Sequence, residues 1–257
     1  MARIFITGSA DGLGQMAADL LVKSGHQVVL HARHEKRAQD ALAAVPGAQG
    51  VITGDLSSIA ETRQVAEQVN KLGAFDAVIH NAGIGYREPR RTATPDGLSH
   101  VFAVNSLAPY ILTCLINRPK RLIYLSSGLH REGDPSLKDL TWTDRAWNGY
   151  RAYADSKLHD LMLAFAVARK WPNVLSNALE PGWVATKMGG VGAPDSLSEA
   201  PKTQVRLATS NDPEALVFGQ YFYHQQRRAF HPAAADIGIQ EKFISACARL
   251  SGVAFPD

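Results

Sequence analysis

A tyrosine and a lysine four residues apart, Tyr153 and Lys157, are the best candidates for acid–base chemistry in this chain of 257 residues. On a helix, residues at i and i+4 share a face, so the phenol and the ammonium would be neighbours. A free phenol has a pKa of about 10 and exchanges protons poorly at neutral pH. A nearby positive charge favours the phenolate and makes the phenol a better catalyst. Tyr150 is a weaker candidate because its i+4 partner is Ala154.

A glycine-rich segment near the N-terminus has the composition of a phosphate-binding loop. It follows a short β-branched run and reads Thr7-Gly8-Ser9-Ala10-Asp11-Gly12-Leu13-Gly14. Glycine permits a tight turn and a close approach of the backbone to a pyrophosphate. The helix that follows would present free N–H groups and a positive dipole end to the phosphates. The segment therefore predicts a dinucleotide site, although its spacing is G-xxx-G-x-G and not G-x-G-x-x-G.

Strand-like and helical segments alternate along the chain and would position these residues. The expected strands are Arg3–Thr7, Gln27–Ala32, Gly50–Thr53, Asp76–His80, Arg121–Ser126, Val174–Leu179 and Val217–His224. The stretches between them carry apolar residues at helical spacing, and a last helix is expected over Asp236–Leu250. This alternation predicts an α/β fold with a doubly wound parallel sheet and helices on both faces. With no linker, repeat or low-complexity tract, residues 1–257 are expected to form one domain.

Composition and charge exclude several other classes of protein. Hydrophobic residues make up 46% and charged residues 20% of the chain, so it is neither disordered nor a coiled coil. A net charge of +3 is too small an excess to indicate a nucleic-acid partner. The two cysteines, Cys114 and Cys247, form no disulfide framework or metal site and fit the cytoplasm. The most apolar stretches, Leu107–Ile116 and Leu161–Ala168, fall short of the roughly 20 residues of a membrane helix.

Further short motifs follow the expected strands in a fixed order. Asn81-Ala82-Gly83 ends the fourth strand, Asn105 lies in the next helix, and Ser127 follows the fifth strand. Pro181-Gly182 and then Thr186 follow the sixth strand. Together with the glycine-rich loop and Tyr-xxx-Lys, this order resembles the short-chain dehydrogenase/reductase family over almost the whole chain. The resemblance implies one Rossmann-type domain with strand order 3-2-1-4-5-6-7 and a nicotinamide cofactor.

The resemblance also implies a role for each motif. Tyr153 would exchange the proton, Lys157 would also bind the nicotinamide ribose, Ser127 would hold the substrate oxygen, and Asn105 would anchor a water that links Lys157 to solvent. Asp55 matches the residue that contacts the adenine amino group, or it caps the helix that starts near Leu56 and Ser57. The implied cofactor-binding residues are Gly8, Ser9, Asp11, Gly12, Leu13, Gly14, Arg33, Asp55, Leu56, Asn81, Ala82, Gly83, Tyr153, Lys157, Pro181, Gly182, Val184 and Thr186.

The end of the second strand bears on the choice between NAD and NADP. Ala32 stands where NAD-binding relatives carry an aspartate, so no carboxylate there would repel a 2′-phosphate. Arg33 offers a forked, charge-assisted contact to that phosphate, with Arg37 as a second candidate. Alternatively, both arginines are solvated charges at a helix start. Asp11 opposes NADP, because many NADP-preferring relatives have a basic residue at that position. On balance the sequence predicts NADP.

The stretch between the serine and the tyrosine is longer than in most relatives. Ser127 and Tyr153 are 26 positions apart, about twice the family's usual gap, and the extra residues Gly128–Gly149 resemble the retinol-dehydrogenase-like branch. The insertion lies near the helices that usually pair subunits, so a homo-oligomer does not carry over from shorter relatives. His130 either lines the pocket or faces water. Trp142 and Trp147 in the same stretch either wall the pocket or cover core.

A glycine- and proline-rich segment, 182–211, is expected to form the substrate loop at the carboxyl edge of the sheet, or else an ordinary surface loop. Its apolar residues Trp183, Met188, Val191 and Leu197 favour a lipophilic or aromatic substrate. The leading hypothesis is an NADP-preferring oxidoreductase that interconverts a carbonyl and a secondary alcohol. The alternative is a non-catalytic regulator that senses the dinucleotide on the same fold. A sugar-nucleotide epimerase is disfavoured by the glycine spacing and the short C-terminal part.

Overall fold

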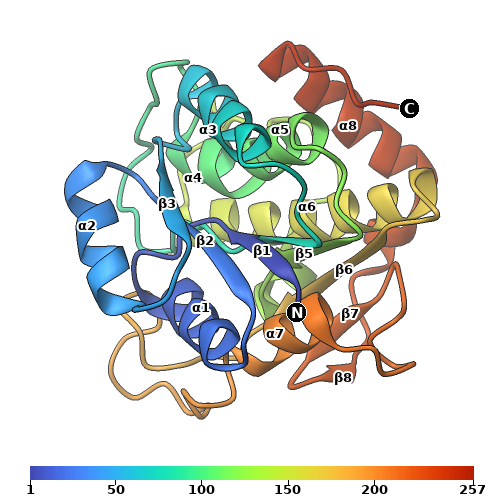
Figure 1. Ribbon diagram of the computed structural model, residues 1–257. Coiled ribbons are helices and arrows are strands. Elements are labelled where there is room, and N and C mark those ends of the chain that lie inside the picture. The colour runs from blue at the N-terminus through green and yellow to red at the C-terminus, as the bar shows by residue number, and fades with distance from the viewer.

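A sheet between two layers of helices organises the computed structural model, which describes all residues 1–257 (Figure 1). The strands are β1 (Arg3–Ile6), β2 (Gln27–Ala32), β3 (Gly50–Thr53), β4 (Ala77–His80), β5 (Arg121–Leu125), β6 (Leu175–Glu180), β7 (Tyr221–Tyr223) and β8 (Gln226–Arg227). Their order in the sheet is β3-β2-β1-β4-β5-β6-β7-β8. The predicted order 3-2-1-4-5-6-7 and the doubly wound α/β class are confirmed.

An eighth strand, absent from the prediction, extends the sheet at its edge. The two residues of β8 pair antiparallel with β7, whereas all other neighbours are parallel. His224 and Gln225 join the two strands with φ of 46° and 65°. Positive φ at both central residues is the geometry of a type I′ hairpin, which usually contains Asn or Gly. Because neither residue type is present, the sequence carried no signal for this turn.

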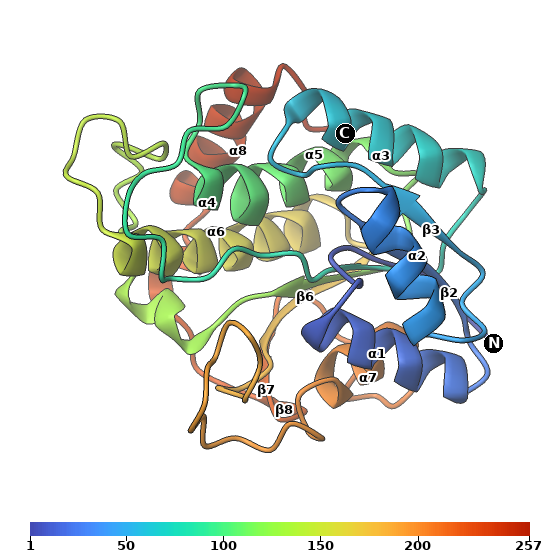
Figure 2. The same ribbon diagram turned by 90° about the vertical axis from the view of Figure 1, so that its left-hand side faces the viewer.

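Helices cover both faces of the sheet (Figure 2). α1 (Gly12–Lys23), α2 (Glu35–Ala44) and α7 (Lys202–Thr209) pack on one face, where residues such as Leu21, Ala41 and Leu207 share a core with the strands. The other face carries α3 (Ile59–Lys71), α4 (His100–Phe102), α5 (Ala108–Leu115), α6 (Gly149–Lys170) and α8 (Ile237–Ser251). A π-helical turn, Ala103–Leu107, connects α4 to α5. None of the helices is both long and apolar enough to cross a membrane.

The parallel register brings the carboxyl ends of the central strands to one edge. Ile6 pairs with Ile79, His80 with Tyr124, and Leu125 with Leu179, so the segments that follow β1, β4, β5 and β6 all leave the sheet on the same side. Ligands of open α/β sheets bind outside this edge. The fold therefore gathers the glycine-rich loop, Asn81-Ala82-Gly83, Ser127 and the segment after β6 around one region.

Two expected segments differ in extent from the structure. The segment 182–211 is not loop throughout, because α7 occupies residues 202–209 and buries Thr203, Leu207 and Ala208 beneath the sheet. The last parallel strand is only Tyr221–Tyr223, because Gly219 turns the chain with φ of 63°. The Asn177 side-chain amide binds the backbone of Val217 and Gln220, which precede the strand. The short, largely polar α7 and the side-chain support from β6 have no periodic signature in the sequence.

Candidate active site

The glycine-rich loop is held in place by the end of β4. The Asn81 side-chain amide donates to the carbonyl oxygens of Thr7 (2.9 Å) and Gly8 (3.0 Å), and Thr7 Oγ1 accepts from the backbone N–H groups of Asn81 and Ala82. Gly8 has φ of 62°, and a Cβ there would lie 2.7 Å from Ala82 Cα. A Cβ on Gly14 would lie 2.4 Å from Asn81 Nδ2. Only glycine therefore fits at these two positions.

A buried histidine that sequence reasoning missed supports the same loop. His31, near the end of β2, accepts the Gly8 N–H at Nδ1 and donates from Nε2 to Gly54 O, each at 3.0 Å. Burial lowers the pKa of His31 to about 4, which keeps the imidazole neutral and able to accept that N–H. The Ser9 hydroxyl donates to Ile6 O and accepts from His31 N. The Ser9 hydroxyl thus faces the core, and the role of Ser9 in cofactor binding stays a prediction.

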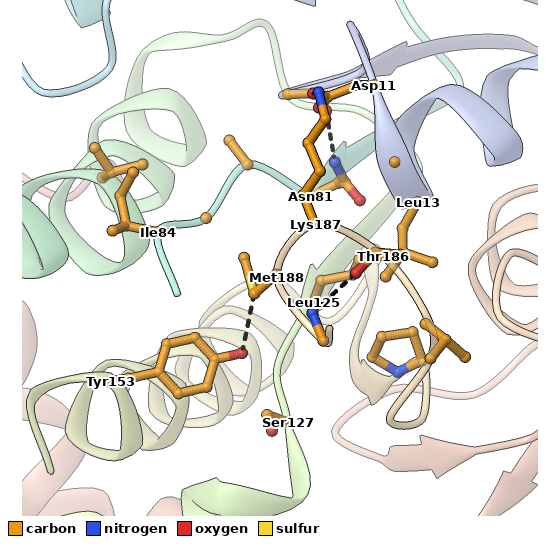
Figure 3. A pocket seen from close by; sticks show the side chains of 18 of the residues that line it. Asp11, Leu13, Asn81, Ile84, Leu125, Ser127, Tyr153, Thr186, Lys187 and Met188 are labelled. Carbon is orange, nitrogen blue, oxygen red and sulfur yellow. Dashed lines mark hydrogen bonds and ion pairs between the residues drawn. The ribbon is translucent and has the colours of Figure 1, made fainter. Parts of the chain in front are cut away.

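A cavity of 1020 Å³ opens along the carboxyl edge of the sheet. Most of the residues that the sequence nominated line it, and they come from segments far apart in the chain (Figure 3). Those nominated residues are Gly8, Asp11, Gly12, Leu13, Arg33, Asp55, Leu56, Asn81, Ala82, Gly83, Ser127, Tyr153, Lys157, Pro181, Gly182, Val184 and Thr186. Ser9, Gly14 and Asn105 do not line the cavity and support its walls from behind.

Tyr153 and Lys157 lie on α6, at the end of the cavity opposite Arg33. The Tyr153 hydroxyl points toward Met188 and lies 3.9 Å from its sulfur, with Ser127 nearby at the end of β5 (Figure 3). Lys157 Nζ is 5.6 Å from the centre of the phenol ring. Burial raises the pKa of Tyr153, and Lys157 and Ser127 oppose that shift without cancelling it. The arrangement supplies an acid–base group whose proton affinity depends on its charged neighbours.

Lys157 is itself held by two buried oxygens. Its Nζ donates to Leu125 O at 2.7 Å and to Asp160 Oδ2 at 2.8 Å. Burial works against the ammonium, but Asp160 and Tyr153 together leave the pKa of Lys157 above its usual value. Burial also raises the pKa of Asp160 to about 6, although Lys157 opposes the shift. Sequence reasoning missed Asp160, whose only signal was a carboxylate three residues after the lysine on an otherwise apolar helix face.

Asn105 lies in the π-helical turn and fixes the chain that follows Gly83. Its Oδ1 accepts from Ile84 N (2.7 Å), and its Nδ2 donates to Ile84 O and to Ser156 Oγ, each at 3.0 Å. A Cβ on Gly83 would lie 3.6 Å from Asn105 Oδ1 and 3.8 Å from Lys157 Nζ, so the three residues meet at one point. Single π-helical turns of this kind occur frequently at functional sites.

The two adjacent serines after β5 face opposite ways, as alternation along a strand predicts. Ser126 is buried and donates to Lys157 O at 2.8 Å. Both serines border the cavity, but the Ser126 hydroxyl is committed to Lys157 O, whereas the Ser127 hydroxyl only accepts from Leu129 N and keeps its proton for a ligand. Of the two, Ser127 is therefore placed to meet a ligand, and Ser126 anchors α6 to the sheet.

At the far end of the cavity, Ala32 and an exposed Arg33 leave β2 beside Asp11. The Asp11 carboxylate pairs with Arg37 Nη2 (2.7 Å) and with Lys187 Nζ (3.1 Å). Burial works to raise the pKa of Asp11, but these two cations outweigh it and lower the pKa. Arg37 is thus not simply a solvated charge, and the contact from Lys187 joins the segment after β6 to the glycine-rich loop.

Asp55 does not cap the helix that follows it. Ser58 is the N-cap of α3, and its hydroxyl accepts from Glu61 N. Asp55 Oδ1 accepts from Ser57 N at 2.9 Å, a local turn that leaves the residue in the cavity wall. Of the two interpretations of Asp55, the helix cap is wrong, because the turn moves the helix start three residues along the chain.

Apart from Gly128 and Leu129, which line the cavity, the insertion 128–149 packs outside it. His130 neither lines the pocket nor faces water: it is fully buried, donates from Nδ1 to Ser127 O (2.7 Å) and accepts at Nε2 from His231 N (3.2 Å). Burial lowers its pKa to about 4. Trp142 and Trp147 pack edge to face, with ring centres 5.5 Å apart, and neither lines the cavity. They cover core, which was one of the two interpretations.

Tyrosines and apolar side chains form much of the wall at the α6 end. Tyr86 contacts Tyr153 and Tyr150 edge to face, with ring centres 5.8 Å and 6.4 Å apart. Trp183, Met188 and Leu197 complete the apolar lining, and the carboxylate of Glu180 is the acidic exception. Sequence reasoning missed Tyr86, because nothing in its spacing ties it to the other motifs.

Comparison with known proteins identifies similar chains. Residues 2–120 match the family model described as short chain dehydrogenase. "Uncharacterized oxidoreductase AN7799" of Emericella nidulans is 49% identical, over 100% of this chain and 99% of its own. "Retinol dehydrogenase 13" of Homo sapiens is 28% identical, over 98% of this chain and 85% of its own. The crystal structure of a protein from Mycobacterium Paratuberculosis superposes with a TM-score of 0.85 at 23% identity, covering 100% of this chain and 96% of that one.

Proposed function

The chain belongs to the short-chain dehydrogenase family, and we propose that it is an NADP-preferring oxidoreductase that interconverts the carbonyl and secondary alcohol of a lipophilic or aromatic compound. The observation that carries the proposal is one cavity with a glycine-rich loop at one end and Ser127, Tyr153 and Lys157 at the other. The family binds a nicotinamide dinucleotide, and the similar proteins are oxidoreductases.

The residues of the cavity fit such a dinucleotide. Gly8 and Gly14 pack too closely against Ala82 and Asn81 for any Cβ, which keeps the loop in its tight turn. Asp11, the N-cap of α1, makes no side-chain hydrogen bond to the first N–H groups of this helix, so its side chain does not block a ligand there. The N-terminus of α1 follows directly and favours negative charge. When bound, the nicotinamide supplies or accepts the hydride at the substrate carbon. Lys157, Asn81 and Thr186 would hold the cofactor at the α6 end.

The acid–base step falls to this chain's own side chains. In reduction, the Tyr153 hydroxyl gives its proton to the carbonyl oxygen as that oxygen gains charge; in oxidation, the phenolate takes the proton back. The Ser127 hydroxyl holds the same oxygen beside the phenol. The Lys157 ammonium stabilises the phenolate, because a positive charge nearby favours the charged form of an acid. Asn105 holds the chain around this group and connects it with Ser156.

The end of β2 supports the preference for NADP. Ala32 presents no carboxylate toward the cavity, and the exposed guanidinium of Arg33 is free to form a forked bond with a phosphate. Arg37, already paired with Asp11, adds positive charge close by. This cluster of cations also offsets the negative charge of Asp11, the one residue in the loop that opposes a 2′-phosphate.

The substrate class is supported by the lining of the α6 end. Tyr86, Tyr150, Trp183, Met188 and Leu197 offer aromatic and apolar surface where the substrate would meet Tyr153. Apolar pockets with few polar groups bind lipophilic ligands and orient them through those groups. The name of the human relative, a retinol dehydrogenase, is in keeping with this class. Turnover only of small charged hydroxy acids in a substrate panel would contradict the proposal.

The decisive experiment is a panel of ketones and alcohols, followed through NADPH absorbance, with the wild type and Tyr153→Phe. We expect Tyr153→Phe to lose at least about 1000-fold in turnover, since the ring stays but the transferable proton is gone. NADPH binding, followed by its fluorescence, should stay close to wild type. A wild type that binds NADPH tightly but turns over no compound would favour the non-catalytic sensor, which none of the comparisons supports.

A further inference from the structure

Asp160 forms a buried ion pair that the proposed chemistry does not yet use. Its carboxylate lies on α6, one turn after Lys157, and accepts from Lys157 Nζ at 2.8 Å. The two side chains are only 4% and 6% exposed. A second bond, from Lys157 Nζ to Leu125 O, leaves the ammonium held between α6 and the end of β5. Burying an ion pair costs desolvation free energy that the pairing does not always repay, so this pair is not explained by stability alone.

We propose that Asp160 is a positioning residue that holds Lys157 against the end of β5 and offsets the positive charge that Lys157 presents to Tyr153, and so sets the pH range of the reaction. The inference rests on the proposed function, because it concerns the proton that Tyr153 exchanges. A lone ammonium would act on the phenol with a full positive charge. The Lys157–Asp160 pair acts as a dipole with no net charge, and its pull on the phenolate is weaker.

Because the three side chains are buried, the difference between a lone ammonium and the Lys157–Asp160 pair has a large effect on the Tyr153 phenol. Tyr153, Lys157 and Asp160 are all buried. Charges interact more strongly in the protein interior than at the surface. The Lys157 ammonium faces the phenol ring at 5.6 Å and lowers the pKa of Tyr153. The Asp160 carboxylate raises that pKa. The two residues therefore act on the same proton with opposite sign.

No other group packed around the pair changes its charge near neutral pH. On β5, burial keeps the pKa of Tyr124 above its usual value, and on α5 burial raises the pKa of Cys114 to about 12. On β4, burial lowers the pKa of His80 to about 3. His159 on α6 is held by Ser106 on the other side of the helix, and burial lowers its pKa to about 3.

Tyr86, from the chain after β4, completes this environment and contacts the Tyr153 ring edge to face at 5.8 Å. Tyr86 also raises the pKa of Tyr153, by less than Asp160 does, so the two largest charge effects on the phenol are those of Lys157 and Asp160. The acid limb of the rate profile then reports the phenol as these two residues set it.

The same helix offers a matched control. Asp155 is also a buried carboxylate, paired with Arg145 Nη2 at 2.6 Å, and it accepts from Asp134 N. It serves the insertion side of α6, and no contact links it to Lys157. Asp155→Asn therefore removes a buried carboxylate of the same kind from the same helix and leaves the charges at Tyr153 unchanged.

The test compares the pH dependence of kcat/KM for alcohol oxidation in the wild type, Asp160→Asn, Asp160→Glu and Asp155→Asn. Oxidation requires the phenolate, so the rate rises with pH through the apparent pKa of Tyr153. Asp160→Asn keeps the size and an oxygen acceptor but removes the charge, and we expect this limb to move down by about 0.5–1 pH unit. Asp160→Glu should return the limb toward wild type, and Asp155→Asn should lower the melting temperature without moving the limb.

An unmoved or upward-shifted limb in a folded Asp160→Asn enzyme would overturn the proposal. A chain that folds with Glu but not with Asn at position 160 would also overturn it, in favour of a purely structural ion pair. These outcomes require an active wild type. A wild type with no activity toward any carbonyl compound or alcohol would instead count against the proposed function itself.

Discussion

The two ends of the cavity are built on different physical principles. At the β1–β2 end, defined by Gly8, Asp11, Gly12 and Arg33, the walls are backbone and exposed charge. At the α6 end, defined by Ser127, Tyr153, Lys157 and Met188, the walls are side chains, and the acid–base pair Tyr153 and Lys157 is buried. At the first end, the space beside the backbone limits which residues fit, and at the second end, charge sets how readily Tyr153 exchanges its proton. Substitutions should therefore act on ligand affinity at one end and on proton transfer at the other.

The β1–β2 end tolerates few substitutions, because backbone atoms lie directly beside Gly8. The loop around Gly8 is held by Asn81, Thr7 and His31 at once, so nothing there moves aside for a new side chain. The charged end is more adjustable, because the affinity of Tyr153 for its proton is a balance among burial, Lys157 and Asp160. A substitution near Tyr153 can therefore change its pKa by a small amount, whereas a new side chain at Gly8 overlaps the backbone whatever its size.

Acidification should destabilise both ends of the cavity together, and we expect it to have the largest effect of the changes considered. Burial lowers the pKa of His31 and His130 to about 4, and of His80 and His159 to about 3, against an ordinary value of 6.5. The unfolded chain therefore binds more protons, and stability present above pH 6.5 is lost as the pH falls toward 4. Asp160 acts in the opposite direction, since its pKa of about 6 lies above the unfolded value. The net loss is up to about 4 kcal/mol per pH unit.

Urea denaturation at pH 7.5 and pH 5.5 measures this loss, and equal midpoints would contradict it. Hydrogen exchange then separates the two ends. The Gly8 N–H, which His31 accepts, reports the β1–β2 end. The His231 N–H, which His130 accepts, reports the insertion beside Ser127. We expect both amides to lose protection together, because each of the four histidines packs against an aromatic ring of the same hydrophobic core.

Gly8→Ala should remove cofactor binding almost completely. The new Cβ would lie 2.7 Å from Ala82 Cα at a φ of 62°, so the loop must distort. We expect dinucleotide affinity to fall by at least about 100-fold, equivalent to about 3 kcal/mol. Gly12→Ala is the matched control: its φ is 57°, but no atom lies within 4 Å of its Cβ, so only the backbone strain remains. Equal losses in the two variants, measured by calorimetry, would show that space does not limit this end.

Arg33→Ala tests whether charge at the β1–β2 end selects the cofactor. A bond between a guanidinium and a phosphate contributes about 1.5–3 kcal/mol, so NADPH affinity should fall about 10- to 100-fold. NADH affinity should change little, because NADH has no phosphate at the 2′ position. Lys36→Ala removes a neighbouring exposed cation that does not line the cavity and serves as the control. Equal losses for NADPH and NADH would mean that Arg33 has only a structural role.

Met188→Ala should have the smallest effect and should be confined to the α6 end. Met188 contacts the Tyr153 hydroxyl across the cavity and is partly exposed, so its removal widens the site with little loss of stability. We expect KM for bulky ketones to fall about two- to tenfold, with a smaller change for compact ones. Steady-state kinetics with a graded series of ketones measures the difference. A change in NADPH affinity as large as the change in KM would contradict the separation of the two ends.

Much of the fold was predictable from local pattern. The strands β2 and β3 have the expected bounds, because continuous apolar runs between polar turns have few alternatives. The edge strand β8 and the helix α7 were not predicted. β8 depends on two non-glycine residues with positive φ, and α7 is short and depends on burial beneath the sheet. Neither feature has a signature at the scale of a few residues.

The sequence by itself determined which residue types are available for chemistry and in what order, because motifs such as Tyr-xxx-Lys and the glycine-rich loop depend on local spacing. Only the tertiary structure decided their electrostatic state. It placed Asp160 on Lys157, neutral His31 against Gly8, and Lys187 on Asp11. Burial and charge pairing arise between elements that are far apart in the chain, and they are defined only once the sheet has brought those elements to one edge.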